Sequence, residues 1–212
     1  MSRPMIFQYW DSSPPGEVAE LMATWETAAK EGFEYRSFDD SAALAFIRDR
    51  FGDRVAQAYL CCGVPAMKAD LFRYCALATS PGIYADADTG RVAPVMPLYK
   101  RLRRGLLMQR RNNVANDFMI ATQPGDSLVR EILRQAVENI EGKVANDVWR
   151  VTGPGIATRL LKQHGNQSAL FEGYEFWPVK TVRKYVQFNW DLPYKSTDLH
   201  WVNSQKTAVI FR

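Results

Sequence analysis

Short extended apolar segments alternate with segments of helical periodicity along the chain, and this alternation constrains the fold more than any other feature. The first extended segment covers residues 4–10 and is followed by a turn rich in Ser, Pro and Gly, and a second candidate strand covers residues 33–38. From Glu17 onward, apolar side chains recur at three- and four-residue steps, which indicates a helix with one buried face. Strands that alternate with helices predict a layered α/β domain.

Later segments continue the same alternation. Further helices are expected after the capping residues 39–41, over 65–78, from 126 or 127 to 140, and after the turn at 152–155. Further strands are expected at residues 83–85, 105–109, 117–122, 174–177 and 185–188. The 212 residues contain no internal repeat, and we expect residues 1–212 to form a single domain.

Composition excludes several classes of protein. The 6 Trp, 9 Tyr and 11 Phe residues provide ample apolar surface for a core, which disordered chains lack. No apolar run approaches the roughly 20 residues that span a bilayer, and the first residues lack the apolar segment of a signal peptide. We therefore expect a soluble, cytoplasmic protein.

The cysteines and histidines give no sign of a catalytic pair or a zinc site. Cys61, Cys62 and Cys75 are odd in number and lack the spacing of a zinc site or a disulfide framework. With only His164 and His200 in the chain, Cys-His chemistry is not expected. We expect the cysteines to be small buried apolar residues.

Most of the net charge of +4 comes from one segment. Six cations lie between Lys100 and Arg111 with no acidic residue among them. Such a cluster is either a solvated basic face or a patch that binds an anionic ligand, a lipid-linked acceptor or a membrane surface, which would make the protein membrane-associated. No nucleic-acid-binding module accompanies it, so nucleic acid is not an expected partner.

Two aspartates, Asp86 and Asp88, follow the strand expected at residues 83–85. Carboxylates two residues apart at a strand end point the same way, and bringing them together is costly unless a cation lies between them. Oxygen-only ligands favour Mg²⁺, Mn²⁺ or Ca²⁺, and a site with few protein ligands suits a metal whose shell phosphate oxygens complete. The pair therefore predicts a divalent-metal site.

The same tripeptide has other interpretations. Asp-x-Asp-x-Gly is also common in acidic surface turns. An EF-hand loop starting at Asp86 is excluded, because its sixth position would be Arg91 and its twelfth Pro97 instead of glycine and glutamate. Aspartyl phosphotransferases also carry Asp-x-Asp after a strand, but Gly90 stands where those enzymes have threonine or valine.

The surroundings of the aspartate pair resemble a known family. Residues 70–74 read Asp-Leu-Phe-Arg-Tyr, and residues 82–88 read Gly-Ile-Tyr-Ala-Asp-Ala-Asp. Together they are similar to the block A-D-x-x-R-Y…G-G-x-Y-x-D-x-D of sugar-nucleotide glycosyltransferases, and most of all to glycosyltransferase family 32. That family includes fungal initiating α-1,6-mannosyltransferases, and the large glucosylating toxins share its core.

Weaker similarities to the family follow in the same order along most of the chain. They lie at residues 6–10, 24–25, 116–121, 152–154 and 199–201. Two positions depart from the family pattern. Pro81 stands where the first of two glycines is expected, and Gln205 follows Ser204 where the family often has tryptophan.

The resemblance implies a GT-A type nucleotide-binding fold, with a central, mostly parallel sheet flanked by helices. It also implies a metal-dependent, retaining hexosyltransferase of polysaccharide synthesis, with Mn²⁺ or Mg²⁺ as cofactor. The donor would be a UDP- or GDP-sugar, and the acceptor a glycan or a lipid-linked molecule. A nucleotide-sugar-binding protein without turnover and a metal-dependent phosphotransferase are the alternatives.

The family pattern assigns catalytic roles to five residues. Asp88 would ligate the metal, and Asp86 would ligate it or bind the donor ribose. Asp70 would accept hydrogen bonds from sugar hydroxyls, with Arg73 beside the same sugar or the diphosphate. Asn116 would orient the donor sugar near its anomeric carbon. The structural alternatives are an exposed ion pair for Asp70 and Arg73 and a helix cap for Asn116.

Four further residues are expected to contact substrate or metal. Gln8 and Trp10 end the first strand, where the indole of Trp10 could stack on the base or could instead belong to the core. Tyr84 would stack or hydrogen-bond at the nucleotide. His200 would supply a nitrogen ligand to the metal or contact a phosphate, unless it is a surface residue.

Overall fold

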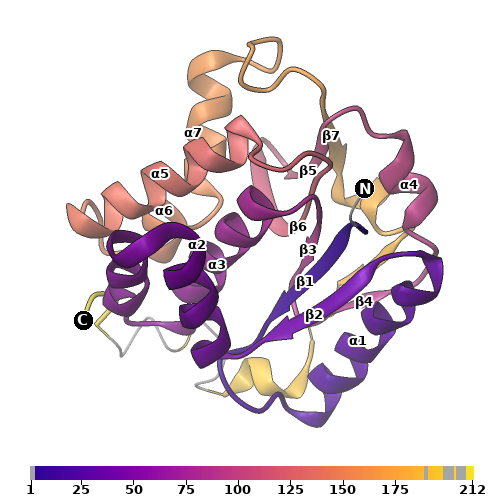
Figure 1. Cartoon of the computed structure of the whole chain (residues 1–212), viewed down its shortest axis with the longest axis horizontal. Helices are drawn as coiled ribbons and strands as arrows, with labels where there is room; N and C mark the ends of the chain where they lie inside the picture. Colours follow the sequence, from indigo (N-terminus) through magenta and orange to yellow (C-terminus); the bar gives the residue numbers. More distant parts are fainter. Residues whose placement is uncertain (1–2, 189–190, 198–202, 204–208) are drawn as a thin grey trace.

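A mixed sheet of six strands lies at the centre of the protein (Figure 1). The structure is a computed structural model that describes residues 3–188, 191–197, 203 and 209–212. The strands of this sheet are β1 (Met5–Tyr9), β2 (Glu34–Phe38), β3 (Gly82–Ala85), β5 (Gly105–Arg110), β6 (Asn113–Ala121) and β7 (Tyr174–Pro178). Their order across the sheet is β2-β1-β3-β6-β5-β7.

Parallel pairing predominates in this sheet. β1 runs parallel to both β2 and β3, and β5 runs parallel to β7. β6 is the exception, because it is antiparallel to both of its neighbours, β3 and β5. The expected α/β architecture with a mostly parallel sheet is therefore confirmed, with one reversed strand near its middle.

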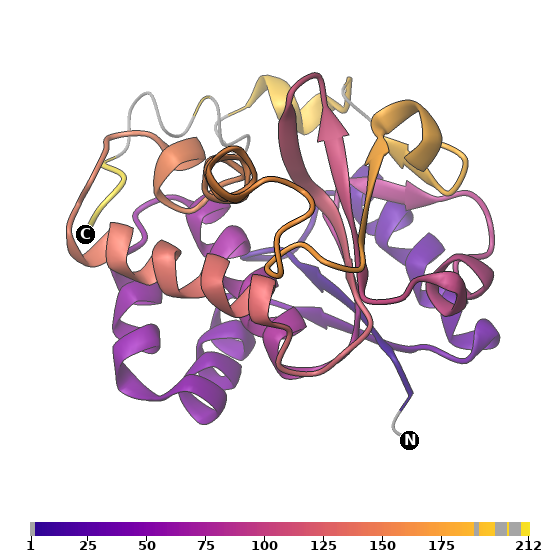
Figure 2. The same ribbon diagram turned by 90° about the horizontal axis from the view of Figure 1, so that it is seen from above.

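Helices cover both faces of the sheet (Figures 1 and 2). One face carries α2 (Asp40–Cys61), α3 (Pro65–Thr79), α5 (Ser127–Glu141), α6 (Val148–Val151) and α7 (Gly155–His164). The other face carries α1 (Gly16–Glu26), α4 (Met96–Arg101), α8 (Val179–Val182) and the antiparallel pair β4 (Thr89–Arg91) and β8 (Val186–Phe188).

The central strands are apolar on both faces because both faces are covered. All five residues of β1 are buried, and its side chains alternate between two hydrophobic clusters. Phe7 packs under α3, whereas Ile6 packs on the side of α1. Strands buried on both faces read as nearly continuous apolar runs, and this segment follows that pattern except at Gln8.

Helix α3 is the central helix of the layer that it shares with α2 and α5. Pro65 occupies its first turn, where a missing N–H costs nothing, and every residue from Asp70 to Ala78 is buried. α3 contacts α2, α5 and the strands β1, β3 and β6. Asp70 and Arg73 are consequently inside the protein, and the alternative of an exposed ion pair is wrong.

Three details differ from the sequence expectations. α2 extends to Cys61 through a kink at Gly52, whose φ of 74° is a left-handed value that glycine adopts without strain. β6 begins at Asn113 instead of residue 117, so Asn116 lies within a strand and caps no helix. The pairing of β4 with β8 brings residues 186–188 next to the aspartate turn, a contact that no local pattern predicted.

The search for a membrane-spanning helix among the described residues found none that is long and apolar enough to cross a bilayer.

Candidate functional site

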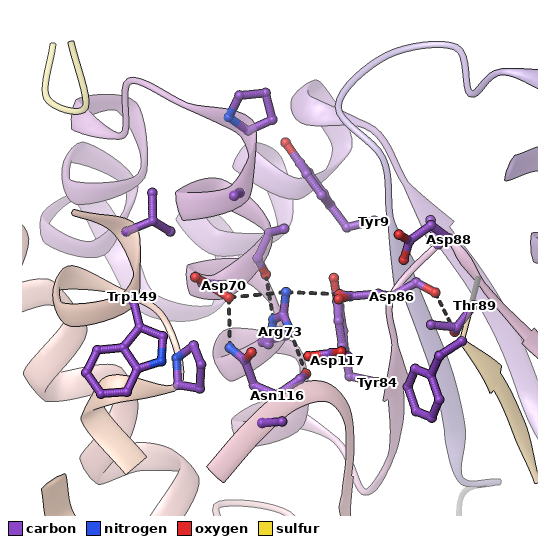
Figure 3. A pocket seen from close by; sticks show the side chains of 18 of the residues that line it. Tyr9, Asp70, Arg73, Tyr84, Asp86, Asp88, Thr89, Asn116, Asp117 and Trp149 are labelled. Atoms are coloured by element: carbon purple, nitrogen blue, oxygen red, sulfur yellow. Dashed lines mark hydrogen bonds and ion pairs between the residues drawn. The ribbon is translucent and has the colours of Figure 1, made fainter. Parts of the chain in front are cut away.

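A cavity of about 450 Å³ lies beyond the carboxyl ends of β1 and β3, bounded by α3, β6 and the 3-10 helix Pro193–Ser196 (Figure 3). Ligand sites of α/β proteins usually occupy this edge of the sheet, outside the carboxyl ends of strands. The five predicted catalytic residues all line this cavity. They are Asp70, Arg73, Asp86, Asp88 and Asn116.

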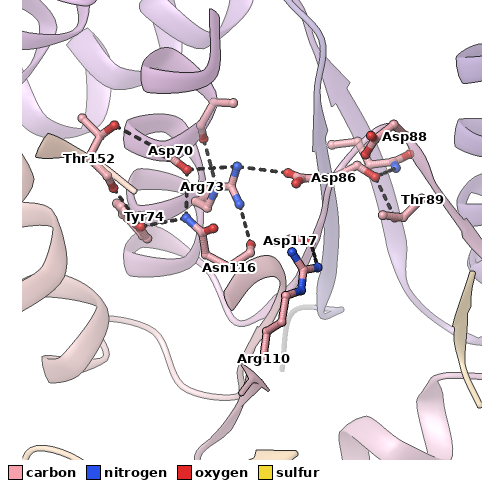
Figure 4. Close-up of polar contacts among 12 residues, drawn as sticks. Asp70, Arg73, Tyr74, Asp86, Asp88, Thr89, Arg110, Asn116, Asp117 and Thr152 are labelled. Atoms are coloured by element: carbon pink, nitrogen blue, oxygen red, sulfur yellow. Dashed lines mark hydrogen bonds and ion pairs between the residues drawn. The ribbon is translucent and has the colours of Figure 1, made fainter. Parts of the chain in front are cut away.

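The guanidinium of Arg73 links the helix side of the cavity to the aspartate turn (Figure 4). Its Nη2 lies 3.2 Å from Oδ1 of Asp70 and 3.0 Å from Oδ1 of Asp86. Its Nη1 donates to the backbone oxygen of Asn116 at 2.5 Å, and its Cζ lies 4.5 Å from the ring centroid of Tyr84. The planar fork of arginine allows these contacts from one side chain, which a lysine could not reproduce.

Asp70 is fixed by neutral donors as well as by Arg73. It accepts hydrogen bonds from Nδ2 of Asn116 at 2.8 Å and from Oγ1 of Thr152 at 3.1 Å. Tyr74 connects the same groups, since its hydroxyl accepts from Asn116 and donates to the backbone oxygen of Thr152. Thr152 belongs to the turn between α6 and α7, so this network anchors that turn to α3.

The two carboxylates that contact Arg73 resist ionisation. Burial raises the pKa of Asp70, and Arg73, Thr152 and Asn116 partly oppose the rise. Burial also raises the pKa of Asp86, against the attraction of Arg73, and the neighbouring Asp117, Asp88 and Asp70 carboxylates raise it further. Asp70 and Asp86 thus share the guanidinium of Arg73, and a further cation bound beside them would favour their ionised forms.

The aspartate pair forms a turn, but this turn is a wall of the cavity and not a surface loop. Thr89 closes the turn by donating from its N and Oγ1 to the backbone oxygen of Asp86, at 3.0 and 2.7 Å. Ala87 and Thr89 are buried, while Asp86 and Asp88 are partly exposed. The interpretation as an acidic surface turn is therefore wrong about where these residues lie, although it is right that their backbone forms a turn.

Two residues of the 3-10 helix Pro193–Ser196 contact Asp88, and sequence reasoning missed both. Nζ of Lys195 lies 2.7 Å from Oδ2 of Asp88, and the hydroxyl of Tyr194 donates to the same oxygen at 2.7 Å. The Asp88 and Lys195 side chains are 18% and 16% exposed, so this ion pair is only partly solvated. More than 100 residues separate the partners, and no local motif signals such a contact.

The aromatic residues at the cavity have different surroundings. The ring of Trp10 packs edge-on against Tyr194, with centroids 5.2 Å apart, and lines the cavity. Tyr84 is fully buried beneath Arg73, so its ring supports the guanidinium and is not available to stack on a base. Among the described residues, Nε1 of Trp10 and the hydroxyl of Tyr84 have no hydrogen-bond partner although both are buried.

Gln8 is fully buried and does not line the cavity. The expectation that its side chain contacts substrate is therefore wrong. Its Nε2 donates to the backbone oxygen of Asp86 at 3.3 Å, and its Oε1 accepts from the hydroxyl of Tyr35 at 3.0 Å. Gln8 is therefore a positioning residue for the aspartate turn. His200 lies outside the described residues, as do positions 199, 201, 204 and 205.

The six cations between Lys100 and Arg111 do not form a single patch of unpaired charge. Four of them contact acidic partners from elsewhere in the chain. These ion pairs are Arg101 with Glu175, Arg103 with Glu172, Arg104 with Asp126, and Arg110 with Asp117. Arg110 and Asp117 line the cavity, whereas the Arg104–Asp126 pair sits at the start of α5.

The donor chemistry of the site fits a hard divalent cation. Asp86, Asp88 and Asp117 present carboxylate oxygens to one cavity. Within the part of the chain that the structure describes, no group of three or more His, Cys, Asp or Glu side chains could hold a metal by itself. A cation would therefore take one or two of these carboxylates and complete its shell with phosphate or water oxygens, as Mg²⁺ and Mn²⁺ commonly do.

Comparisons with known proteins identify the same region. Residues 15–104 match the family model described as "Glycosyltransferase sugar-binding region containing DXD motif". The chain is 27% identical over 164 residues to the initiation-specific alpha-1,6-mannosyltransferase of Schizosaccharomyces pombe, a match over 63% of this chain and 41% of that protein. The chain thus spans about two fifths of the length of that relative.

The solved structures support the fold. The PaToxG glycosyltransferase is similar with a TM-score of 0.53 and 15% identity, over 75% of this chain and 67% of that chain. At this level of identity the likeness concerns the fold, and the expected GT-A type is confirmed. The matched residues 15–104 contain Asp70, Arg73, Asp86 and Asp88, so this part of the chain is similar to the sugar-binding region of glycosyltransferases that carry a DXD motif, in line with its resemblance to family 32.

Proposed function

We propose that this chain transfers a hexose from a UDP- or GDP-sugar to a hydroxyl of a glycan or a lipid-linked acceptor, with retention of the anomeric configuration. The observation that carries the proposal is the convergence of Asp86 and Asp88 with the buried Asp70–Arg73 pair on one cavity of about 450 Å³. A cavity of this size at the carboxyl ends of strands suits a nucleotide-sugar.

Asp86 and Asp88 are the residues that would hold Mn²⁺ or Mg²⁺. When bound there, the cation would supply Lewis-acid stabilisation of the diphosphate as the sugar leaves it. Lys195 contacts Asp88 and lines the cavity, so its ammonium group would meet the same diphosphate. Trp10 lies at the end of β1 beside Tyr194, where it can offer its indole to the base.

Asp70, Arg73 and Asn116 would orient the donor sugar. Hydrogen bonds from Asn116 and Thr152 fix the position of the Asp70 carboxylate. Group transfer needs catalytic groups that are held in fixed positions relative to the substrate. In the proposed reaction the bond between the anomeric carbon and the phosphate oxygen breaks, and the acceptor oxygen bonds to the same carbon. The acceptor's proton leaves with the nucleoside diphosphate, and attack from the same face accounts for retention.

The proposal is tested by incubating the protein with a panel of UDP- and GDP-sugars and Mn²⁺ and measuring free nucleotide. We expect slow hydrolysis of one donor and loss of most of this activity in Asp88→Asn. Asp53→Asn is the matched control, because the Asp53 side chain is 96% exposed on α2, outside the cavity.

Other outcomes would point to the alternatives. Binding of a nucleotide-sugar without nucleotide release would indicate a binding protein without turnover. Release of phosphate from simple phosphoesters would indicate a phosphotransferase. Equal activity of Asp88→Asn and the wild-type protein would contradict the role given to the aspartate pair.

A further inference from the structure

We propose that Trp149 forms the platform of an acceptor subsite, on which a hexopyranose ring of the acceptor packs while it is glycosylated. This inference rests on the proposed function, because it assigns the second substrate of the same cavity. The proposed occupant of the Trp149 subsite is a sugar ring, and not a lipid chain or a peptide.

Trp149 is unusual among the described residues because it is a large aromatic side chain that is left exposed. Its exposed fraction is 39%, and the other exposed large apolar residues in the described part of the chain are Leu60, Val92, Val144 and Val209. Trp149 is the one residue of this group that lines the cavity. An exposed aromatic ring at the wall of a ligand cavity is more informative than an exposed apolar residue elsewhere on a surface.

The indole packs closely against the following turn, where two glycines leave room for it. A Cβ atom on Gly155 would lie 2.7 Å from Cε3 of the Trp149 ring and 2.4 Å from the Trp149 backbone oxygen. A Cβ atom on Gly153 would lie 2.9 Å from Cα of Trp149. The turn therefore lets the Trp149 ring lie directly against the backbone at the start of α7.

The same turn connects the platform to the predicted donor site. Thr152 lies between Trp149 and Gly153, and its hydroxyl donates to Asp70 at 3.1 Å. The backbone oxygen of Thr152 accepts from Tyr74 of α3. A ring that packs on Trp149 is thus placed relative to the carboxylate that would orient the donor sugar.

The position of Trp149 within the cavity argues for the acceptor. Figure 3 shows Trp149 and Asp88 on opposite sides, with Asp70 and Arg73 between them. The diphosphate is proposed at Asp88 and the donor sugar at Asp70 and Arg73, so the far side remains for the acceptor hydroxyl.

The chemistry of this side suits a pyranose. Pro65, Ala66, Val148 and Pro154 line the same cavity as Trp149 and add apolar surface to it, while Asp70 and Asn116 of the polar network also line it. A pyranose has the same division, with C–H groups on a face that packs on an aromatic ring and hydroxyls around its rim that form hydrogen bonds. A lipid chain has no hydroxyls that could add hydrogen bonds at this polar edge.

The experiment measures saccharide and nucleotide binding separately. The probes are methyl glycopyranosides of mannose, glucose and galactose and their disaccharides, observed by saturation-transfer difference NMR in the presence of UDP or GDP and Mn²⁺. In Trp149→Ala we expect saccharide affinity to fall roughly tenfold and nucleotide affinity to stay unchanged. Trp149→Tyr keeps an aromatic face and is expected to retain most of the saccharide affinity.

Leu60→Ala is the matched control, since Leu60 is also 39% exposed but lies on α2 away from the cavity. If Trp149→Ala does not fold, as judged by its thermal transition, Trp149→Gln removes the aromatic face with a smaller loss of volume and takes its place in the comparison.

The outcomes separate this inference from the proposed function. Unchanged saccharide binding in the Trp149 variants, or no saccharide binding by the wild-type protein, would overturn the inference. Loss of nucleotide binding with saccharide binding retained would also overturn it and would make Trp149 a platform for the base. Saccharide binding that depends on Trp149 in a protein that binds no nucleotide would support the subsite and contradict the proposed donor.

Discussion

Replacement of Arg73 by methionine tests the physical account of the site most stringently. The side chain of Arg73 is 5% exposed and is shared between Asp70 and Asp86, at 3.2 and 3.0 Å. Arg73→Met keeps similar length and volume but leaves both carboxylates without their cation. We expect a large loss of stability, because an uncompensated buried charge is costly.

The magnitude follows from the exposure of the two partners. Removing one member of a buried ion pair typically costs about 3–5 kcal/mol. The Asp70 side chain is 7% exposed and takes the full effect, whereas Asp86 is 29% exposed and is partly solvated. We therefore expect the lower end, about 3 kcal/mol, which at a urea m value of about 2 kcal/mol/M lowers the unfolding midpoint by about 1.5 M.

The loss should depend on pH in a defined direction. Burial raises the pKa of both carboxyls, and Arg73 opposes that rise, so the variant raises both pKa values further. A carboxyl whose pKa is higher in the folded than in the unfolded state binds a proton on folding, and its contribution to stability decreases as pH rises. The cost of Arg73→Met should therefore be smaller at pH 5 than at pH 7.5.

Urea unfolding of both proteins at these two pH values measures the effect. Arg134→Met is the control, because Arg134 is 52% exposed and pairs with Glu131 and Glu138 on the surface of α5. Its loss should cost less than about 1 kcal/mol. A cost for Arg73→Met that is as small as the control's, or that does not change with pH, would refute the reasoning.

Two further predictions concern contacts that the sequence did not reveal. Lys195→Met should strengthen Mn²⁺ binding about fivefold, because Lys195 lies 2.7 Å from Asp88 and its loss removes a competing ion pair of about 1 kcal/mol. Electron paramagnetic resonance of free Mn²⁺ measures the affinity, with Lys180→Met as the control; weaker or unchanged binding, or an equal effect of the control, would contradict the prediction. Asp126→Ala should cost about 3 kcal/mol in urea unfolding, because Asp126 caps α5 and also pairs with Arg104. Asp126→Asn keeps the capping oxygen and should cost about 1 kcal/mol less; equal costs for the two variants would show that the cap contributes nothing.

The elements around the site were largely predictable from local patterns. β1, α1, β2, α3 and α5 lie close to their expected positions, because continuous apolar runs, helical periodicity, Pro65 and the Asp126 cap are signals within a few residues. The convergence of the Asp70 helix with the aspartate turn followed from the resemblance to a family and from no local pattern.

The reversed strand β6 was beyond the reach of such patterns. Alternating burial is the same in parallel and antiparallel strands, so it does not reveal chain direction. β5 and β6 are joined by a tight turn at Arg111 and Asn112, where Arg111 has a φ of 57°. The usual signal for such a turn is Asn-Gly or Asp-Gly, and this turn lacks glycine.

Long-range polar contacts were also unpredictable. Gln8 was expected to bind substrate because it lies in the opening segment that resembles the family, but its side chain turns to Tyr35 and the aspartate turn. The Arg104–Asp126 pair was hidden for the same reason, since a run of cations in sequence says nothing about acidic partners that the fold brings to it.

We expect Asp86 and Asp88 to hold a divalent cation against the diphosphate of a nucleotide-sugar. Anomalous X-ray diffraction at the manganese edge, from crystals grown with Mn²⁺ and UDP or GDP, locates the metal directly. We expect one manganese peak at ligand distance from an Asp88 oxygen and from the diphosphate. A nucleotide bound in the cavity without manganese at the aspartate pair, or manganese bound elsewhere, would contradict it.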